Sequence, residues 1–370
     1  MKILLITGSF PPMKCGVGDY TAKLAEALSG NKDMAVSVLT DASIKQRTGN
    51  TPYKVIASIE AWTIRDIFRV IDEVENFSPD IVHIQYPTQA YGKKLFPWLI
   101  PMMLHFRKLP VVQTWHEHYP VGNWRAYFTS WVPGGLIAVR PNYKDRMPPW
   151  FQRIISKKQF CFIPNSSTIP AVKISSGERR SIRDRFGATN CRLIVYYGFV
   201  FPTKGIESIF EICNPEQHRI VLICDLDPGV PYHRSIEALA DNSLWKEKSF
   251  VTGFLPAIDV ANILASADAV VLPFKTGGGI WNTSIHGVRA QGTFLLTTSN
   301  QKSGYSEYEN TYYAKPLDIT DMKNALGKYT GIRSENPPPD QFTRWESIAT
   351  THIEFYKNVL DNIRKARRNA

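Results

Sequence analysis

Residues 273–292 read PFKTGGGIWNTSIHGVRAQG and give the clearest indication of the fold. They follow Ala269–Leu272, an apolar run with the length of a buried strand. Three consecutive glycines come next, and Asn282, Thr283 and Ser284 then precede a segment that is compatible with a helix. The sequence therefore predicts a strand, a glycine loop and a polar-capped helix in succession, as in the units of an α/β protein.

This succession favours an anion site, and an ordinary capped helix is the alternative. Glycines let the backbone approach a ligand without a Cβ in the way. The first N–H groups of a helix have no intrahelical partner and carry the positive end of the helix dipole. A simple N-cap would use the same Asn, Thr or Ser side chains to satisfy those groups. The stretch alone leaves both interpretations open.

The composition is that of a folded chain with more than one domain. At 370 residues the chain has room for two or three domains, and 44% hydrophobic residues suffice for packed cores. No apolar stretch in the sequence reaches the ~18 residues that a membrane helix needs. The N-terminus predicts a first strand and not a signal peptide, because no small-residue cleavage site follows its apolar run. Five scattered cysteines without a CxxC pair argue against a disulfide framework and a structural zinc site, so a cytoplasmic location is expected.

The charge balance predicts an anionic partner. The formal net charge is +11 and the isoelectric point is near 9.3, which suits nucleic acid, a lipid surface or a phosphorylated substrate. The sequence has neither zinc-finger spacing nor an RNP-type run, so no nucleic-acid partner is expected. The basic tail at 364–368, RKARR, is interpreted either as a solvated helix end or as a contact with lipid headgroups.

The first half of the chain alternates between strand-like and helix-like segments. The apolar run at 2–7 enters a turn that contains Gly16, Val17 and Gly18, and a segment with helical spacing follows. Further strands are expected at 35–40, 81–86, 111–115, 135–139 and 161–164, with a helix at 64–74. This alternation predicts a doubly wound parallel sheet with a ligand at the carboxyl ends of its strands. GVG is too short to count as a full GxGxxG dinucleotide signature.

A turn-rich connector at 164–170, which contains two prolines, leads into a second unit with the same alternation. Its strands are expected at 193–198, 220–224, 249–253, 269–272 and 293–298, with helices at 178–186, from 206 and at 260–264. We therefore predict an N-terminal Rossmann-like domain at 1–170, a C-terminal Rossmann-like domain at 171–344 and a final helix at 345–370. Two such open sheets are expected to face one another across a cleft.

Two side chains beside the expected strand ends are candidates for chemistry. Lys204 lies on a glycine-flanked loop after a strand, where an ammonium can neutralise a phosphate, although a surface lysine is the alternative. His116 follows the strand at 111–115, where an imidazole can hydrogen-bond a sugar hydroxyl or a phosphate, or transfer a proton. The sequence HEH at 116–118 lacks the i, i+4 spacing of HExxH and a clear third ligand, so no metal site is expected and His118 is interpreted as structural.

Motifs along nearly the whole chain resemble the GT-B glycosyltransferases of family 4, which are retaining enzymes that use nucleotide-sugar donors. The motifs are FPPMKCGVGDYTAKLAEAL at 10–28, SPDIVHIQYP at 78–87, VVQTWHEHYP at 111–120, IPNSSTIP at 163–170, VYYGFVFPTKGIE at 195–207, VTGFLPAIDVANILASADAVVLPF at 251–274 and FTRWESIATTHIEFY at 342–356. The resemblance implies a GT-B fold, with two doubly wound Rossmann-like α/β domains and a C-terminal helix that returns to the first domain.

The resemblance also implies roles for individual residues. His116 and Lys204 would be catalytic, His116 through the transferred sugar and Lys204 through the donor diphosphate. Further diphosphate contacts would come from Gly16, Val17, Gly18, Thr283 and Ser284. The remaining sugar contacts would come from Gly278, Gly279, Ile280 and Asn282, and the base and ribose contacts from Phe199, Gly253, Phe254 and Leu255.

The sequence departs from the family pattern at three places. Gly279 and Gly287 stand at or near the positions of two family glutamates. Residues 281–284, WNTS, stand where a subgroup carries arginines, and a phenylalanine stands near the arginine that often precedes the lysine. Charge on the phosphates would therefore rest more on Lys204 and on helix-terminal amides.

The implied function is transfer of a hexose from UDP-glucose or a similar UDP-hexose to a saccharide or lipid-linked acceptor in bacterial envelope or exopolysaccharide synthesis. No cofactor and no metal would be required, because a lysine and helix amides would neutralise the charge of the phosphates in place of a metal ion. The alternatives are a nucleotide-sugar-binding protein, another GT-B enzyme such as an epimerase or a glycosyl-phosphate synthase, and a degenerate enzyme.

The acceptor side is expected in the first domain. Residues 91–98, YGKKLFPW, together with Arg107, Lys108, Trp124 and Arg125, interleave aromatic and basic side chains. This composition suits a lipid-linked acceptor at an anionic membrane surface, and an ordinary solvated face is the alternative. The first interpretation adds peripheral attachment to the inner face of the plasma membrane to the expected cytoplasmic location.

Overall fold

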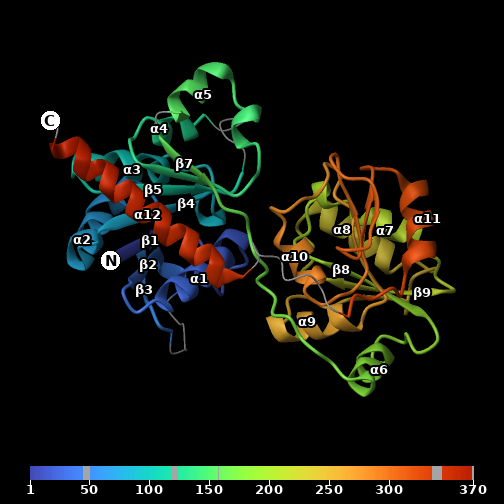
Figure 1. The fold of residues 1–370 in the computed structure, drawn as a ribbon. Coiled ribbons are helices and arrows are strands. Elements are labelled where there is room, and N and C mark those ends of the chain that lie inside the picture. The colour runs from blue at the N-terminus through green and yellow to red at the C-terminus, as the bar shows by residue number, and fades with distance from the viewer. Residues whose placement is uncertain (45–50, 118–123, 157, 336–343, 369–370) are drawn as a thin grey trace. The chain divides into compact units, whose positions relative to one another are not determined.

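The computed structural model describes residues 1–44, 51–117, 124–156, 158–335 and 344–368 (Figure 1). The chain forms two compact units, one made of Met1–Ser166 with Gln341–Ala370 and the other of Ser167–Asp340. Each unit is built on a seven-stranded sheet. In the described part of the chain, no helix is both long and apolar enough to cross a membrane.

The first unit contains sheet A, in the order β3-β2-β1-β4-β5-β6-β7, and its strands pair in parallel. The strands are β1 (Lys2–Ile6), β2 (Ala35–Asp41), β3 (Lys54–Ile59), β4 (Ile81–Tyr86), β5 (Val111–Trp115), β6 (Gly135–Ala138) and β7 (Gln159–Phe162). The strand order reverses between β1 and β4. Open α/β sheets bind ligands beyond the carboxyl ends of the strands at such a switch point.

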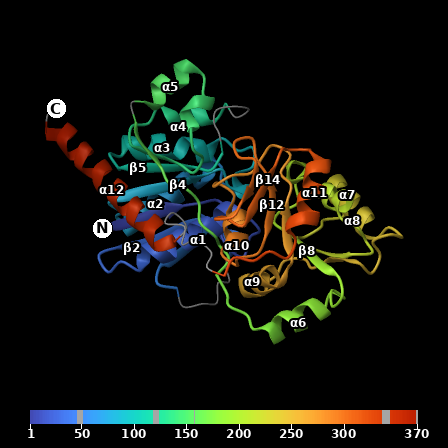
Figure 2. The same ribbon diagram turned by 45° about the vertical axis from the view of Figure 1, so that its right-hand side comes forward.

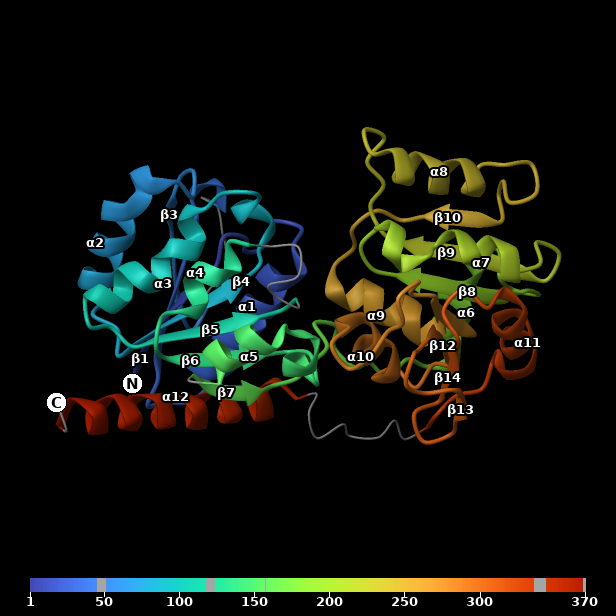
Figure 3. The ribbon, with the colours of Figure 1, turned by 90° about the horizontal axis from the view of Figure 1, so that it is seen from above.

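Helices cover both faces of sheet A. Helix α1 (Gly16–Ser29) packs against α12 (Trp345–Arg368) on one face. The other face carries α2 (Ile67–Phe77), α3 (Phe96–Phe106), α4 (Ala126–Ser130) and α5 (Pro149–Ile155). Figure 3 shows α12 on the opposite side of the sheet from α2 and α3. Residues of β1 alternate between the two cores, with Ile3 and Leu5 facing α1 and α12.

The C-terminal helix returns to the first unit, as predicted, and Gly135 explains its close approach. A Cβ at Gly135 would lie 2.7 Å from the ring of Phe355, so the absent side chain lets α12 lie directly on β6. Ile348, Ile353 and Val359 on the same helix are also buried. The predicted apolar stripe is therefore what attaches α12 to the sheet.

The second unit contains sheet B, in the order β10-β9-β8-β11-β12-β14-β13, with only β13 antiparallel to its neighbour among the described pairs. Its strands are β8 (Arg192–Tyr197), β9 (His218–Ile223), β10 (Ser249–Val251), β11 (Ala269–Leu272), β12 (Leu295–Thr298), β13 (Gly304–Ser306) and β14 (Thr311–Ala314). Its helices are α6 (Ser176–Asp184), α7 (Glu207–Ile212), α8 (Pro231–Ala240), α9 (Ala257–Ser266), α10 (Thr283–Arg289) and α11 (Ile319–Tyr329). Figure 2 shows α7, α8 and α11 on one side of this sheet and α9 and α10 on the other. Both units therefore have the predicted doubly wound α/β architecture.

One interpretation of the sequence is wrong. The aromatic residues of 91–98 do not form a surface patch, because Tyr91, Phe96 and Trp98 are buried. Trp98 stacks on Tyr86 with ring centroids 4.6 Å apart, and this cluster is part of the core under α3. Large aromatic side chains gain more free energy from burial than the neighbouring lysines lose, since the lysine heads stay in water.

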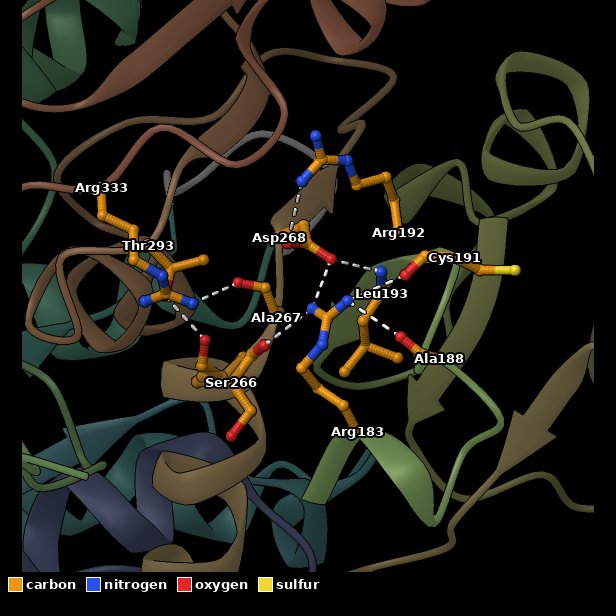
Figure 4. A network of polar contacts seen from close by, with 11 residues as sticks. Arg183, Ala188, Cys191, Arg192, Leu193, Ser266, Ala267, Asp268, Thr293 and Arg333 are labelled. Carbon is orange, nitrogen blue, oxygen red and sulfur yellow. Dashed lines mark hydrogen bonds and ion pairs between the residues drawn. The ribbon is translucent and has the colours of Figure 1, made fainter. Parts of the chain in front are cut away.

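The amino ends of β8 and β11 are held together by a polar network around Asp268 (Figure 4). One carboxylate oxygen of Asp268 accepts from Arg183 at 2.5 Å and from the backbone N–H of Leu193 at 2.7 Å. The other oxygen lies 3.6 Å from Arg192. Arg333 donates to the carbonyl of Ala267 at 2.5 Å. The carboxylate of Asp268 thus has two arginine partners within the chain, and Arg333 has a backbone carbonyl.

Candidate functional site

Lys204 and the glycine loop lie at the switch point of sheet B. Lys204 ends a short 3-10 helix, Pro202–Lys204, after β8, and the loop follows the neighbouring strand β11. The backbone N–H of Lys275 donates to the carbonyl of Thr203 at 2.9 Å and joins the two loops. Gly205 has φ +67°, and a Cβ there would lie 2.4 Å from the carbonyl oxygen of Pro273. Only glycine fits this close contact, which fixes Lys204 beside the glycine loop.

The surroundings of Lys204 separate it from the second lysine nearby. The ammonium of Lys204 lies 4.7 Å from the centroid of the Phe274 ring. Lys275 instead forms an ion pair with Glu207, which also accepts a hydrogen bond from Tyr232 at 2.5 Å. Burial opposes ionisation of Glu207, but the hydrogen bonds from Lys275 and Tyr232 bring its pKa below the ordinary value. Lys275 is therefore paired with Glu207, while the ammonium of Lys204 lies over the Phe274 ring beside the glycine loop.

The amides of the three-glycine loop are used within the chain. Gly277 donates to Phe274 at 3.1 Å and Gly278 to Thr298 at 2.7 Å. Gly279 donates to the side-chain oxygen of Asn282 at 3.0 Å. Backbone contacts with an anion would therefore come from the first turn of α10, at Thr283 and Ser284, where a helix has no internal acceptors. The three glycines therefore contribute through their absent side chains, which leave room beside the loop.

Gly279 and Gly287 stand at or near two positions that carry glutamates in the family that the sequence resembles, and other groups fill the room beside both glycines. A Cβ at Gly279 would lie 2.2 Å from the ring of Trp281. A Cβ at Gly287 would lie 3.3 Å from the hydroxyl of Ser167 and 3.5 Å from Ile169. The chain therefore uses the room of those side chains for an indole ring and for the connector before α6.

An aromatic surface lies next to the Lys204 loop. Phe199 and Phe254 have ring centroids 5.9 Å apart, and Phe254 is 51% exposed. Gly253 has φ +70°, and a Cβ there would meet no atom within 4 Å. Leu255 packs against the core below. The structure thus brings the four predicted base-binding residues together, with rings on which a planar base can stack.

In the first unit, His116 lies just beyond the carboxyl end of β5. Its backbone N–H donates to Tyr86 at 2.8 Å, and its Nε2 lies 2.9 Å from Gln85 Oε1. Burial, together with His352 and Arg140, lowers the pKa of His116 to about 3. The ring is neutral at physiological pH. It can therefore hydrogen-bond a sugar hydroxyl, but it carries no positive charge for a phosphate.

The predicted glycine turn of the first unit opens α1. Gly16 is exposed and Val17 is half-buried, while Gly18 is buried. A Cβ at Gly18 would lie 2.8 Å from the carbonyl oxygen of Ser9, so this glycine lets α1 pack onto the turn after β1. Of the three predicted contacts in this turn, Gly16 and Val17 are therefore the ones that the fold leaves accessible.

Sequence reasoning missed two polar residues near these strand ends. Asp19 lies in the first turn of α1, and burial raises the pKa of its carboxyl to about 6. An acidic residue directly after GVG was the available signal. Gln85 lies at the end of β4 and bonds His116, which no sequence spacing reveals. His118 lies outside the described residues, and among those described no group of three or more His, Cys, Asp or Glu side chains is placed to hold a metal ion.

Comparison with known proteins identifies the fold. No family model matches the chain, and no curated protein sequence matches it. Solved structures do match. Sucrose-phosphate synthase from Thermosynechococcus elongatus is 15% identical with a TM-score of 0.73, and the match covers 98% of this chain and 100% of that one. The chain has a GT-B fold.

Two further structures support this fold. HepE from Anabaena, solved in complex with UDP-glucose, is 13% identical with a TM-score of 0.65, and both chains are covered fully. WaaG, described as a glycosyltransferase involved in lipopolysaccharide biosynthesis, is 14% identical with a TM-score of 0.60, covering 98% of this chain and 99% of that one. At such identities the likeness establishes the fold, and the activity has to be argued from the site.

Proposed function

We propose that this protein is a retaining hexosyltransferase whose donor is UDP-glucose or a similar UDP-hexose. One observation carries the proposal: Lys204, the first turn of α10 and the pair of half-buried Phe199 and exposed Phe254 follow strand ends at the carboxyl edge of sheet B, around its switch point. These groups match the parts of a nucleoside diphosphate, with a cation and amides for the phosphates and rings for the base. The solved complex of HepE with UDP-glucose supports a donor of this class.

The proposed reaction needs no enzymic nucleophile. The bond between C1 of the hexose and the diphosphate oxygen breaks, and a bond from C1 to the acceptor oxygen forms on the same face. The acceptor's proton passes to the departing UDP. Lys204 and the α10 amides stabilise the negative charge that develops on the leaving phosphate. Hydrogen-bond donors that face developing charge usually make the largest single contribution to the rate. No metal is required in this proposal, so EDTA is expected to leave the rate unchanged.

In the first unit, His116 is proposed to bind a sugar hydroxyl. Its Nε2 bonds Gln85, so the neutral imidazole has its second ring nitrogen left to bond a hydroxyl group. A hydrogen bond between the neutral imidazole and a sugar hydroxyl would fix the orientation of the sugar.

The proposed acceptor is a saccharide or lipid-linked saccharide of bacterial envelope or exopolysaccharide synthesis, met at an anionic membrane surface. The exposed aromatic side chains that support this lie at α4 and α5: Trp124 is 55% exposed, Trp131 70% and Trp150 53%. Arg125 lies 5.2 Å from the ring of Trp124. Exposed indoles beside arginine are typical of surfaces that enter the headgroup region. Flotation with anionic liposomes at low salt, but not with neutral ones, is the expected result.

A nucleotide panel tests the proposed donor. We expect UDP and UDP-glucose to raise the unfolding temperature in the presence of EDTA, with smaller shifts from ADP and GDP, because a ligand that binds only the folded state stabilises it. Slow release of UDP and glucose from UDP-glucose would then show turnover without an acceptor. The absence of any shift with nucleoside diphosphates would contradict the proposal. Conversion of a UDP-sugar to its epimer without transfer would favour another GT-B enzyme.

A further inference from the structure

A chain of polar side chains lies behind His116, inside the first unit. His83 and Gln85 on β4, Thr114 on β5 and Tyr356 on α12 are all fully buried, with 0% exposure. Buried polar groups of this kind have to be paired, and a fully paired network fixes one arrangement of its members. This network can therefore fix the arrangement of His116, which bonds one of its members.

The hydrogen bonds run without a break from His116 to the C-terminal helix. His116 Nε2 lies 2.9 Å from Gln85 Oε1, and Gln85 Nε2 lies 3.2 Å from His83 Nε2. On its other side, His83 Nδ1 lies 2.6 Å from the hydroxyl of Tyr356. Thr114 adds a contact of 2.7 Å to His83 Nε2.

The amide of Gln85 relates the protons of this network to one another. In the orientation that the structure gives this amide, its oxygen faces His116, and an amide oxygen only accepts, so His116 Nε2 would carry a proton and donate it to Gln85. An amide nitrogen only donates, so His83 Nε2 has to be bare, and its proton has to lie on Nδ1 facing Tyr356. His116 Nδ1 is then the nitrogen with a lone pair. It has no hydrogen-bond partner among the residues that the structure describes.

A contact from α1 holds the same ring from the side, and this contact is tied to α12. The ring of Tyr20 lies edge-on to His116, with centroids 4.7 Å apart. The hydroxyl of Tyr20 lies 3.4 Å from His352 Nε2, and His352 Nδ1 lies 2.7 Å from the carbonyl of Ile348 in its own helix. Burial lowers the pKa of His83 and His352 as well, so the network consists of neutral rings.

We propose that Gln85 is a positioning residue that locks His116 in the tautomer with its proton on Nε2 and its lone pair on Nδ1, and that His83 and Tyr356 anchor Gln85 to helix α12. The proposal rests on the role of His116 in sugar binding given above. It adds a direction to that role: His116 Nδ1 accepts a hydrogen bond from a sugar hydroxyl and cannot donate one. It also gives α12 a function beyond attachment, because the last helix of the chain then sets the chemistry of a residue on β5.

The direct test is ¹⁵N NMR of the full chain labelled at histidine, with the His116 signals assigned by difference from His116→Gln. We expect a protonated Nε2 and a bare Nδ1 in the wild type. In Gln85→Met, which keeps the side-chain length and loses the acceptor, we expect a mixture of both tautomers. Gln85→Glu keeps an acceptor oxygen and is expected to restore the single Nε2–H form.

The chain offers a matched control in Gln113. This glutamine is 1% exposed, lies on β5, and bonds Trp115 and the carbonyl of Thr129 instead of His116. Gln113→Met is expected to leave the His116 tautomer unchanged. A wild-type ring with its proton on Nδ1, or a Gln85→Met ring that keeps the single Nε2–H form, would overturn the proposal. The wild-type spectrum alone shows which nitrogen of His116 carries the proton.

Ligand affinity separates a positioning role from a purely structural one. We expect Gln85→Met to weaken UDP-glucose binding by ~10-fold, about the effect of one hydrogen bond, and UDP binding by less than ~2-fold. Equal weakening of both ligands would overturn the positioning role. If the wild type bound neither ligand, the proposed function would fail, while the tautomer measurement would still decide the arrangement of the network.

Discussion

The two ends of sheet B use charge in opposite ways. At the amino ends, Asp268 is 13% exposed and accepts from Arg183 and from the backbone of Leu193. At the carboxyl ends, Lys204 lies over the ring of Phe274, between loops that depend on glycine. Pairing within the chain makes the first end a source of stability. At the second end, Lys204 and the first turn of α10 lie beyond the carboxyl ends of the strands, where open α/β sheets bind their ligands.

Replacing Lys204 by alanine should have the largest effect on activity and little effect on stability. We expect turnover to fall by ~10²–10³, the usual effect of losing one donor to a developing oxyanion. The free energy of unfolding should change by no more than about 1 kcal/mol, which is the usual size of a cation–π contact such as the one that Lys204 makes with Phe274. Steady-state kinetics and urea unfolding of the same preparation measure the two quantities.

Lys248→Ala is the matched control for that variant. Lys248 pairs with the exposed Glu216 at 2.8 Å and follows no strand end of the site. It should lose neither activity nor stability. Near-normal turnover in Lys204→Ala would remove Lys204 from the mechanism.

Asp268→Asn should show the reverse pattern. It keeps the shape of the side chain and leaves Arg183 without its charged partner, which typically lowers the free energy of unfolding by about 3 kcal/mol. Affinity for UDP should stay within ~2-fold of wild type under folding conditions. Glu216→Gln, which breaks an exposed pair of the same unit, should lower stability by about 0.5 kcal/mol or less. If Asp268→Asn lost more free energy of UDP binding than free energy of unfolding, the two ends of sheet B would not have separate roles in stability and binding.

The same substitution at the carboxyl edge of sheet A should stabilise the protein. Burial raises the pKa of Asp19 from 3.8 to about 6, so the folded state disfavours its ionised form. The penalty is absent below the unfolded value and grows as pH rises toward the folded one. Asp19→Asn should therefore raise the free energy of unfolding by about 2 kcal/mol at pH 8 and have little effect near pH 4.

Urea unfolding at the two pH values measures this change, with the exposed Asp72→Asn on α2 as the control. A loss of stability at pH 8 in Asp19→Asn would mean that the carboxylate is stabilised by a partner. Asp19 would then resemble Asp268, whose carboxylate is stabilised by partners within the chain.

Most of the fold could be predicted because parallel strands buried on both faces appear as continuous apolar runs, as in β1, β4 and β11. The strands β3, β13 and β14 were missed. β3 is largely half-buried and contains serine and lysine, β13 (GYS) is half-buried throughout, and β14 (TYYA) has no run of aliphatic residues. Such segments lack the pattern on which prediction depends.

The candidate site could be predicted only in part. Lys204 and the aromatic pair follow strand ends, so their gathering at one edge is a consequence of topology. The burial of Tyr91 and Trp98 could not be predicted, because aromatic and basic residues alternate equally well at a surface and over a core. The bond between His83 and Tyr356 joins residues 273 positions apart, and no local pattern encodes it.

Isothermal titration of UDP into the full chain, in EDTA, is the decisive measurement for the proposed donor site. We expect one binding site, an affinity at least ~10-fold weaker in Lys204→Ala, and an affinity in Asp268→Asn that stays within ~2-fold of wild type. The absence of UDP binding in the wild type, or equal affinities of the wild type and Lys204→Ala, would contradict the proposed donor site.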